Sequence, residues 1–225
     1  MFVREARLNS FQAFHARAAE YDTWYDSEAG AAIFAMELDC LRPFLHQQRR
    51  PYLEIGVGSG RFAQALGIEC GLDPSPALLR MAVSRGTQVV KAVGEKLPFA
   101  DGAFGGVLIA LTLCFVDDPA KVLREARRVL VPGGGLVLGL ILEGSPWAEF
   151  YASKGRQGHP LYSRARFFSR RQVEDLLQLA GFHALDYCSI LFQMPGQRLY
   201  SPERSVSGYC KAAGFVAIDS CKRDI

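Results

Sequence analysis

Residues 52–60 read Tyr-Leu-Glu-Ile-Gly-Val-Gly-Ser-Gly. The apolar start predicts a buried β-strand over 52–55, and Gly56, Gly58 and Gly60 predict a tight turn into a following helix. Because glycine has no Cβ, the backbone of such a turn can approach a ligand closely, as it does in nucleotide-binding α/β proteins. The turn therefore indicates a nucleotide-like ligand or, alternatively, a strand-to-helix connection that binds nothing.

Two carboxylates and the glycine spacing narrow the class of ligand. The dinucleotide-binding pattern has its third glycine where this chain has Arg61, which disfavours a pyrophosphate. Glu54, directly before the turn, suits a ligand that carries a cation. Asp73 ends the next predicted strand, seventeen positions after Gly56, where a carboxylate can accept hydrogen bonds from both hydroxyls of a ribose. The alternative for Asp73 is a helix N-cap.

From Tyr52 onward, short apolar runs alternate with amphipathic segments, and this predicts an α/β domain with a largely parallel sheet. Residues 9–44 are expected to be mainly helical. Strands are expected at 52–55, 68–72, 88–92, 106–110 and 135–140, followed by an antiparallel hairpin of 183–192 with 214–218. Helices are expected at 59–66, from Pro76, from Pro119 to a turn at 132–134, and at 169–180, where Gly181 stops the last one.

Composition excludes several classes of function. The chain has 225 residues, and its formal charge of +3 is far from the concentrated basic face of a nucleic-acid-binding protein. We therefore expect no nucleic acid partner. The start of the chain shows no signal pattern, and the longest apolar run, 107–116, is too short to cross a bilayer, which predicts a cytoplasmic protein without membrane association.

The six cysteines are scattered, without a C-x-x-C pair and without histidines at metal-ligand spacing. Several lie in apolar runs, where a cysteine is usually a small buried hydrophobic residue. We therefore expect reduced thiols and no metal site. The cysteines are Cys40, Cys70, Cys114, Cys188, Cys210 and Cys221.

Four blocks together carry a family resemblance: residues 52–60, Gly71-Leu72-Asp73-Pro74-Ser75, Gly94-Glu95-Lys96-Leu97-Pro98-Phe99, and Arg127 to Gly134. In order and spacing they resemble the type 11 family of class I S-adenosylmethionine-dependent methyltransferases, over about residues 50–142. The resemblance implies a Rossmann-like fold with a seven-stranded, mostly parallel sheet containing one antiparallel strand, helices on both faces and a helical N-terminal cap. It also implies a single methyltransferase domain over 1–225, divided into the cap (1–48), a cofactor-binding core (50–142), a substrate-side insertion (143–168), and a C-terminal helix with a strand hairpin (169–225).

The same resemblance implies S-adenosyl-L-methionine as cofactor and a set of residues around it. The family often has acids at two positions where this chain has Val93 and Gly105, so the adenine is expected to depend more on backbone groups and apolar packing. For Tyr21, packing of an aromatic helix on the domain is the alternative. The implied residues are Glu54, Gly56, Gly58 and Gly60 at the methionyl part, Asp73 at the ribose, Pro74, Gly94 and Glu95 at the adenine, Leu111 at the sulfonium side, and Tyr21 across the cofactor.

The methyl acceptor is expected to be a small molecule that the sequence does not identify. It should approach over the carboxyl edge of the sheet, between the N-terminal aromatics and the 143–168 insertion. That insertion mixes aromatic and cationic side chains, which suits an aromatic or anionic molecule, with a solvated basic loop as the alternative.

Methyl transfer needs a dedicated general base mainly for a hydroxyl or an acidic carbon. His15 and His159 are the histidines to test as proton acceptors, and we assign no catalytic residue. A non-catalytic adenosyl-ligand-binding protein and an NAD-dependent dehydrogenase are the competing interpretations, and Arg61 disfavours the second.

Overall fold

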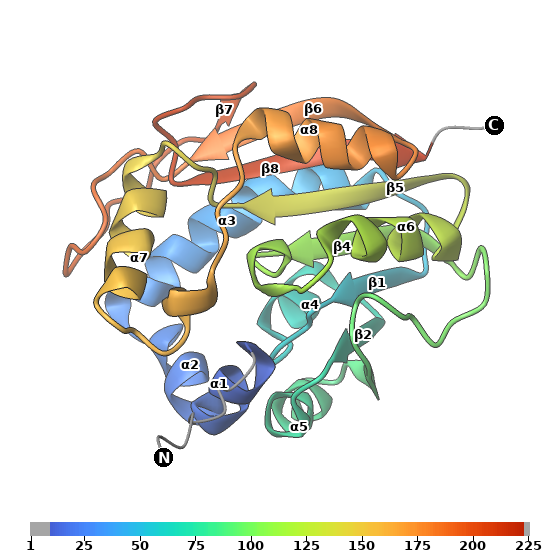
Figure 1. The fold of residues 1–225 in the computed structure, drawn as a ribbon, viewed down its shortest axis with the longest axis horizontal. Helices are drawn as coiled ribbons and strands as arrows, with labels where there is room; N and C mark the ends of the chain where they lie inside the picture. Colours follow the sequence, from blue (N-terminus) through green and yellow to red (C-terminus); the bar gives the residue numbers. More distant parts are fainter. Residues whose placement is uncertain (1–9, 223–225) are drawn as a thin grey trace, which may run out of the picture.

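The computed structural model describes residues 10–222 and consists of one mixed sheet between two layers of helices (Figure 1). The strands are β1 (Tyr52–Ile55), β2 (Cys70–Asp73), β3 (Gln88–Lys91), β4 (Phe104–Ala110), β5 (Leu130–Leu140), β6 (Phe182–Ile190), β7 (Val206–Ser207) and β8 (Phe215–Lys222). They lie in the order β3-β2-β1-β4-β5-β8-β6-β7. Strands β1 to β5 pair in parallel, β8 is antiparallel to β5 and β6, and β7 is antiparallel to β6.

This arrangement confirms the predicted Rossmann-like methyltransferase fold and corrects its strand number. The sheet has 8 strands rather than seven, because β7 adds a two-residue strand at the edge beside β6. Two residues are too few to produce the alternation that identifies a strand in a sequence. The predicted hairpin near the end of the chain corresponds to β6 and β8.

The helices begin where the sequence supplies caps. Ser75, Asp118, Ser145 and Ser169 each accept a hydrogen bond from a backbone N–H three residues further on. The helices are α1 (Ser10–Ala16), α2 (Ala18–Trp24), α3 (Glu28–His46), α4 (Arg61–Leu66), α5 (Pro76–Ser84), α6 (Pro119–Val129), α7 (Pro146–Arg156) and α8 (Arg170–Leu179), with short 3₁₀ turns η1 (Leu113–Phe115) and η2 (Tyr162–Arg164). Helix α7 and η2 lie in the insertion, where the sequence pattern predicted no helix.

The central strand β4 shows why both helix layers are needed. All seven of its residues are buried, and the side chains from Val107 to Ala110 alternate between two apolar clusters. Val107 and Ile109 pack in the cluster that contains the apolar residues of α6 and α8. Leu108 and Ala110 pack in the cluster formed with α3, α4 and α5. A strand covered on both faces therefore has the near-continuous apolar sequence that predicted it.

The connection between α6 and β5 differs from the expectation. Helix α6 ends at Val129, and β5 begins at Leu130 instead of Gly135. The residues 132–134, predicted to end the helix, lie within an irregular part of β5, where the register against β4 shifts. The prediction was wrong because a β-bulge and a turn use the same glycines.

The expectation of six reduced thiols is corrected at two positions. Cys40 on α3 and Cys188 on β6 form a disulfide across a sequence separation of 148 residues, whereas Cys70, Cys114, Cys210 and Cys221 are free. Both partners lie in secondary structure far apart in the chain, so no local spacing could reveal the pair. Of the residues described, none forms a helix long and apolar enough to span a membrane.

The helices of the N-terminal cap and of the insertion lie together at one edge of the sheet. Helices α1, α2 and α7 lie beyond the carboxyl ends of β1, β4 and β5 (Figure 1). This is the edge at which parallel α/β sheets bind their ligands. The first nine residues of the predicted cap lie outside the described part of the chain.

Candidate functional site

A cavity of about 200 Å³ lies at the carboxyl ends of β1, β2 and β4, and we call it the glycine-turn cavity. It brings together all of the predicted site residues except Gly60. Residues separated by many positions in sequence, from Tyr21 to Leu111, therefore line one space. The predicted members that line it are Tyr21, Glu54, Gly56, Gly58, Asp73, Pro74, Gly94, Glu95 and Leu111.

The turn after β1 requires glycine for two physical reasons. Gly56 and Gly58 have φ angles of +78° and +52°, in the left-handed region that side chains disfavour. A Cβ on Gly56 would also lie 2.3 Å from the side-chain oxygen of Thr112. Without side chains at these two positions, the backbone of the turn borders the cavity directly, while the N–H groups of Gly56 and Val57 donate to the Leu72 carbonyl.

Asp73 fixes the shape of this turn. Its carboxylate accepts hydrogen bonds from the Gly58 N–H at 3.2 Å and from the Ser75 N–H at 2.8 Å. The helix N-cap that follows is Ser75, so the alternative of Asp73 as the N-cap is wrong. Burial raises the pKa of Asp73 despite the two N–H donors.

Glu54 is buried beside the turn with an unsatisfied oxygen. Its exposure is 1%, and its Oε2 atom has no hydrogen-bond partner. Burial and the neighbouring charge of Asp73 hold its pKa well above the ordinary value. A buried carboxylate without a partner costs free energy unless a cation or donor binds to it. The Glu54 carboxylate therefore fits a ligand whose cationic group lies beside the turn.

Gly60 does not line the cavity, whereas its neighbour Arg61 does. A Cβ on Gly60 would lie 2.8 Å from the Cα of Ala82, so this glycine allows α4 to approach α5. Arg61, which replaces the third glycine of dinucleotide binders, binds the carboxylates of Asp22 and Asp26. It thereby attaches α2 to the start of α4.

At the predicted adenine side of the cavity, Gly94 and Glu95 have different structural roles. A Cβ on Gly94 would lie 3.0 Å from a side-chain carbon of Ile55, which makes this glycine a close-packing position. The Glu95 carboxylate accepts backbone N–H bonds from Asp117 at 3.1 Å and Asp118 at 3.3 Å. It orders the loop before α6.

Tyr21 covers the glycine turn from above. A Cβ on Gly58 would lie 3.7 Å from a ring carbon of Tyr21 and 3.7 Å from its hydroxyl oxygen. Its hydroxyl lies 3.2 Å from that of Tyr25, and its ring meets Phe14 edge-to-face with centroids 5.5 Å apart. Burial raises the pKa of Tyr21, with Asp73, Glu54 and Glu37 adding to the effect.

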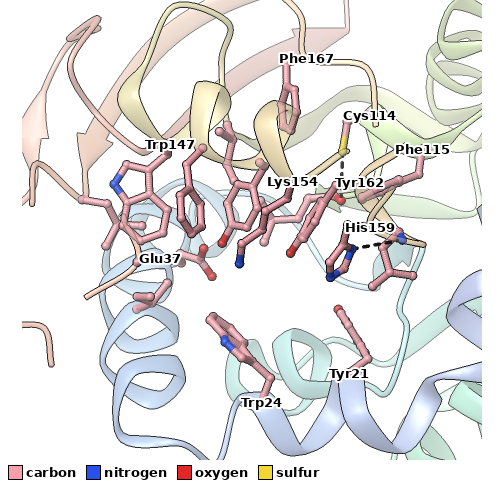
Figure 2. A pocket seen from close by; sticks show the side chains of 18 of the residues that line it. Tyr21, Trp24, Glu37, Cys114, Phe115, Trp147, Lys154, His159, Tyr162 and Phe167 are labelled. Carbon is pink, nitrogen blue, oxygen red and sulfur yellow. Dashed lines mark hydrogen bonds between the residues drawn. The ribbon is translucent and has the colours of Figure 1, made fainter. Parts of the chain in front are cut away.

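A second cavity, of about 340 Å³, adjoins the first, and we call it the aromatic cavity. Five residues line both: Phe14, Tyr21, Tyr25, Leu111 and Phe115. Figure 2 shows side chains from α7 and η2 facing those of α2 and α3 across this space. Leu111 has a φ of +52°, an unusual conformation for a residue with a side chain, at the junction of the two cavities.

The two histidines singled out in the sequence are placed differently. His159 lines the aromatic cavity, its ring 4.6 Å from that of Tyr162, and burial lowers its pKa. His15 lies outside both cavities, with Nδ1 3.2 Å from the Ser75 hydroxyl. In the described part of the chain, no three His, Cys, Asp or Glu residues gather in a way that could hold a metal ion.

Sequence reasoning missed Glu37, which lines the aromatic cavity although its exposure is only 4%. It lies on the buried face of α3 with Ile33, Met36 and Leu41. Those positions follow the i, i+3, i+4 spacing of an apolar stripe, and a carboxylate within such a stripe was the available signal. Thr112, which lines the glycine-turn cavity, was also missed.

The strand order and the ligand-sized cavity at the carboxyl ends of β1 and β2 define a Rossmann-like α/β protein. Comparison with known proteins narrows the class. The family described as Methyltransferase domain matches residues 53–138. A protein of Mycobacterium tuberculosis is 46% identical over 216 residues, which are 96% of this chain and 76% of the relative.

Two solved structures extend the likeness over the whole fold. A Thermotoga maritima structure, described as an SAM-dependent methyltransferase and possible histamine N-methyltransferase, has a TM-score of 0.88 and 34% identity over 96% of this chain and 100% of that one. The N-methyltransferase NodS of Bradyrhizobium japonicum, in complex with S-adenosylhomocysteine, shares the fold with a TM-score of 0.66 and 17% identity, over 96% of this chain and 100% of NodS. The chain belongs to the class I S-adenosylmethionine-dependent methyltransferases, and S-adenosylmethionine is its cofactor.

Proposed function

We propose that this protein is an enzyme that transfers the methyl group of S-adenosylmethionine to a small molecule bound in the aromatic cavity. The observation that carries the proposal is the junction of the two cavities at Leu111, Tyr21 and Phe115. A cofactor in one and an acceptor in the other would meet there. The junction is lined by apolar and aromatic side chains, which exclude water from the reacting atoms.

Within the glycine-turn cavity, each group has a proposed task toward the cofactor. Glu54, with its unsatisfied oxygen, would bind the ammonium of the methionyl part, and the glycines of the turn would let that part lie close to the backbone. Asp73 would accept hydrogen bonds from the ribose. Gly94 and Pro74 would pack on the adenine. When bound, the cofactor supplies a methyl group that its sulfonium already activates, so the protein contributes mainly by positioning.

The acceptor is proposed to be small because the aromatic cavity has a volume of about 340 Å³ and side chains close it on several sides. Tyr151 and Tyr162 stack with ring centroids 4.5 Å apart and form part of its wall. The acceptor named for the Thermotoga maritima structure is also a small molecule.

The proposal is tested by titrating the purified protein with S-adenosylmethionine, S-adenosylhomocysteine and NAD, and by incubating it with methyl-labelled S-adenosylmethionine and a metabolite extract. We expect the two adenosyl ligands to bind, NAD to fail, and label to appear in a small molecule. Binding without formation of S-adenosylhomocysteine from any metabolite pool would indicate a non-catalytic adenosyl-binding protein. Binding of NAD alone would indicate a dehydrogenase.

A further inference from the structure

The proposed function leaves one buried charge in the aromatic cavity without a task. Glu37 projects from the middle of α3, and Figure 2 shows its carboxylate pointing into the cavity between Trp147 and Trp24. Its Oε2 atom has no hydrogen-bond partner, and its exposure is 4%. A carboxylate placed this way in a core has a large desolvation cost and no compensation from the protein.

Aromatic rings line the same cavity as this carboxylate. Trp147 lies 6.2 Å from Tyr151 and 5.6 Å from Tyr200, centroid to centroid, and Trp24 packs at 5.0 Å on Tyr25. All five of these rings line the aromatic cavity. The negative faces of aromatic rings attract an organic cation, and a carboxylate among them adds a full charge of the same sign. The combination disfavours an anion and favours a cation.

No cationic side chain of the described residues forms an ion pair with Glu37. Burial raises the pKa of Glu37 to about 8, with no cation lowering it. Lys154, a cation that lines the cavity, lies with its Nζ over the Phe150 ring at 4.3 Å and is not among the ion pairs of the described residues. Arg17 is paired with Glu20 at the exposed end of the cavity. The Glu37 Oε2 atom therefore remains open to a hydrogen-bond donor or cation of a ligand.

We infer that the Glu37 carboxylate binds a protonated or quaternary nitrogen of the methyl acceptor, which makes the acceptor a small organic cation with an apolar or aromatic body. The inference rests on the proposed function, because it names the substrate class for the same site. It also replaces the anionic acceptor that the basic residues of the insertion suggested.

The position of Glu37 determines which end of the acceptor it holds. Glu37 lines the aromatic cavity only, whereas Leu111, Tyr21 and Phe115 line both cavities. A cationic group bound at Glu37 would therefore lie within the aromatic cavity, and the atom that receives the methyl group would be a second atom of the acceptor, at the junction. That atom keeps a free lone pair, as attack on a sulfonium methyl requires, while the cation serves as an anchor.

The test uses three probes of matched shape, phenethylammonium, phenethyl alcohol and phenylacetate, titrated into the full chain by tryptophan fluorescence with S-adenosylhomocysteine present. We expect the ammonium probe to bind about ten-fold or more tightly than either of the others. In Glu37→Gln, which keeps the shape and removes the charge, this preference should fall to about two-fold or less. Glu20→Gln makes the same change at the exposed end of the cavity and should retain the preference.

Three results would overturn the inference: tightest binding of phenylacetate, an ammonium preference that survives in Glu37→Gln, or no binding of any probe by a protein that binds S-adenosylhomocysteine. Calorimetry with S-adenosylhomocysteine separates this failure from that of the proposed function. Its affinity should be equal in the original chain and in Glu37→Gln, which also shows that the variant folds. If the original chain does not bind S-adenosylhomocysteine, the proposed function fails instead.

Discussion

The guanidinium of Arg61 binds the carboxylate of Asp22 through two hydrogen bonds, from Nε to Oδ1 at 2.8 Å and from Nη2 to Oδ2 at 3.1 Å. Arg85 binds the same carboxylate at 2.8 Å and donates to the backbone oxygen of Ser59 at 2.7 Å. These contacts hold α2, and with it Tyr21, against the turn after β1. A two-point contact of this kind fixes orientation as well as distance.

Asp22→Asn should therefore weaken the binding of S-adenosylhomocysteine by about ten-fold and destabilise the fold by about 1–3 kcal/mol, because two arginines lose a mostly buried partner. The control is Asp26→Asn, which changes a second, largely exposed carboxylate on the same arginine and should cost about 0–1 kcal/mol. Calorimetric titration and urea unfolding measure both effects. Equal losses in the two variants would contradict the role of Asp22.

Asp73→Asn should reduce affinity for S-adenosylhomocysteine by about ten- to hundred-fold, because the charged acceptor proposed for the ribose is lost. The domain should stay folded, since an amide oxygen can still accept one of the two backbone N–H bonds. Glu69→Gln is the matched control, because that carboxylate binds Arg50 and the Tyr52 N–H outside the glycine-turn cavity. Unchanged affinity in a folded Asp73→Asn protein would remove Asp73 from the site.

Gly56→Ala should destabilise the protein by about 3 kcal/mol or more, because the new methyl group meets Thr112 in addition to the backbone strain. Gly86→Ala isolates the strain: Gly86 has a φ of +88°, and no atom lies within 4 Å of the position that a Cβ would take there. That control should cost about 1 kcal/mol. Urea unfolding compares the two variants, and similar losses would show that close packing at Gly56 is unimportant.

Glu37→Gln should stabilise the unliganded protein, and the gain should grow with pH. Burial raises the pKa of Glu37 from 4.5 in the unfolded chain to about 8 in the folded protein. Below about pH 4.5 the carboxyl group is protonated in both states and does not affect the free energy of unfolding. As pH rises from there through 8, the folded protein loses stability, because ionisation costs more for the buried carboxyl group than for the same group in the unfolded chain. The tyrosines facing it, Tyr25 and Tyr151, have raised pKa values and stay neutral in this window.

The rise in the Glu37 pKa from 4.5 to about 8 makes the gain near zero at about pH 4 and on the order of 5 kcal/mol at about pH 9. Urea unfolding of both proteins across this range measures it. A gain that is constant with pH would contradict the burial of an ionisable Glu37. Addition of phenethylammonium should reverse the order of stability at high pH, because only the original chain has a charge to pair with it.

Most of the fold could be predicted because the core strands carry their own signals. Strand β4 is apolar along its whole length, and α5, α6 and α8 begin at recognisable caps. Strand β7 and the start of β5 could not be predicted, since a two-residue strand and a bulge have no periodicity. The disulfide of Cys40 with Cys188 depends on how α3 packs on β6, which spacing along the chain does not encode.

The candidate site also has one part that the sequence predicts and one part that it does not. The glycine-turn cavity follows a local pattern, so residues such as Glu54, Gly58 and Asp73 could be grouped from the sequence, and they line one cavity. The aromatic cavity is assembled from α2, α3, α7 and the loop around Tyr200, which no motif connects. Glu37 belongs to this second group. Its helix looks like ordinary core packing until the tertiary structure shows what its carboxylate faces.

Tyr21, which covers the glycine turn and also borders the aromatic cavity, limits how kinetic experiments on this protein can be interpreted. A substitution there changes the walls of both cavities, so the apparent KM values for cofactor and acceptor will change together. Variants at Asp73 and at Glu37, which each border one cavity, are the pair that can assign an effect to a single ligand. Steady-state data collected with these two would show which ligand each KM change belongs to, whereas in a Tyr21 variant both KM values would change for one structural reason.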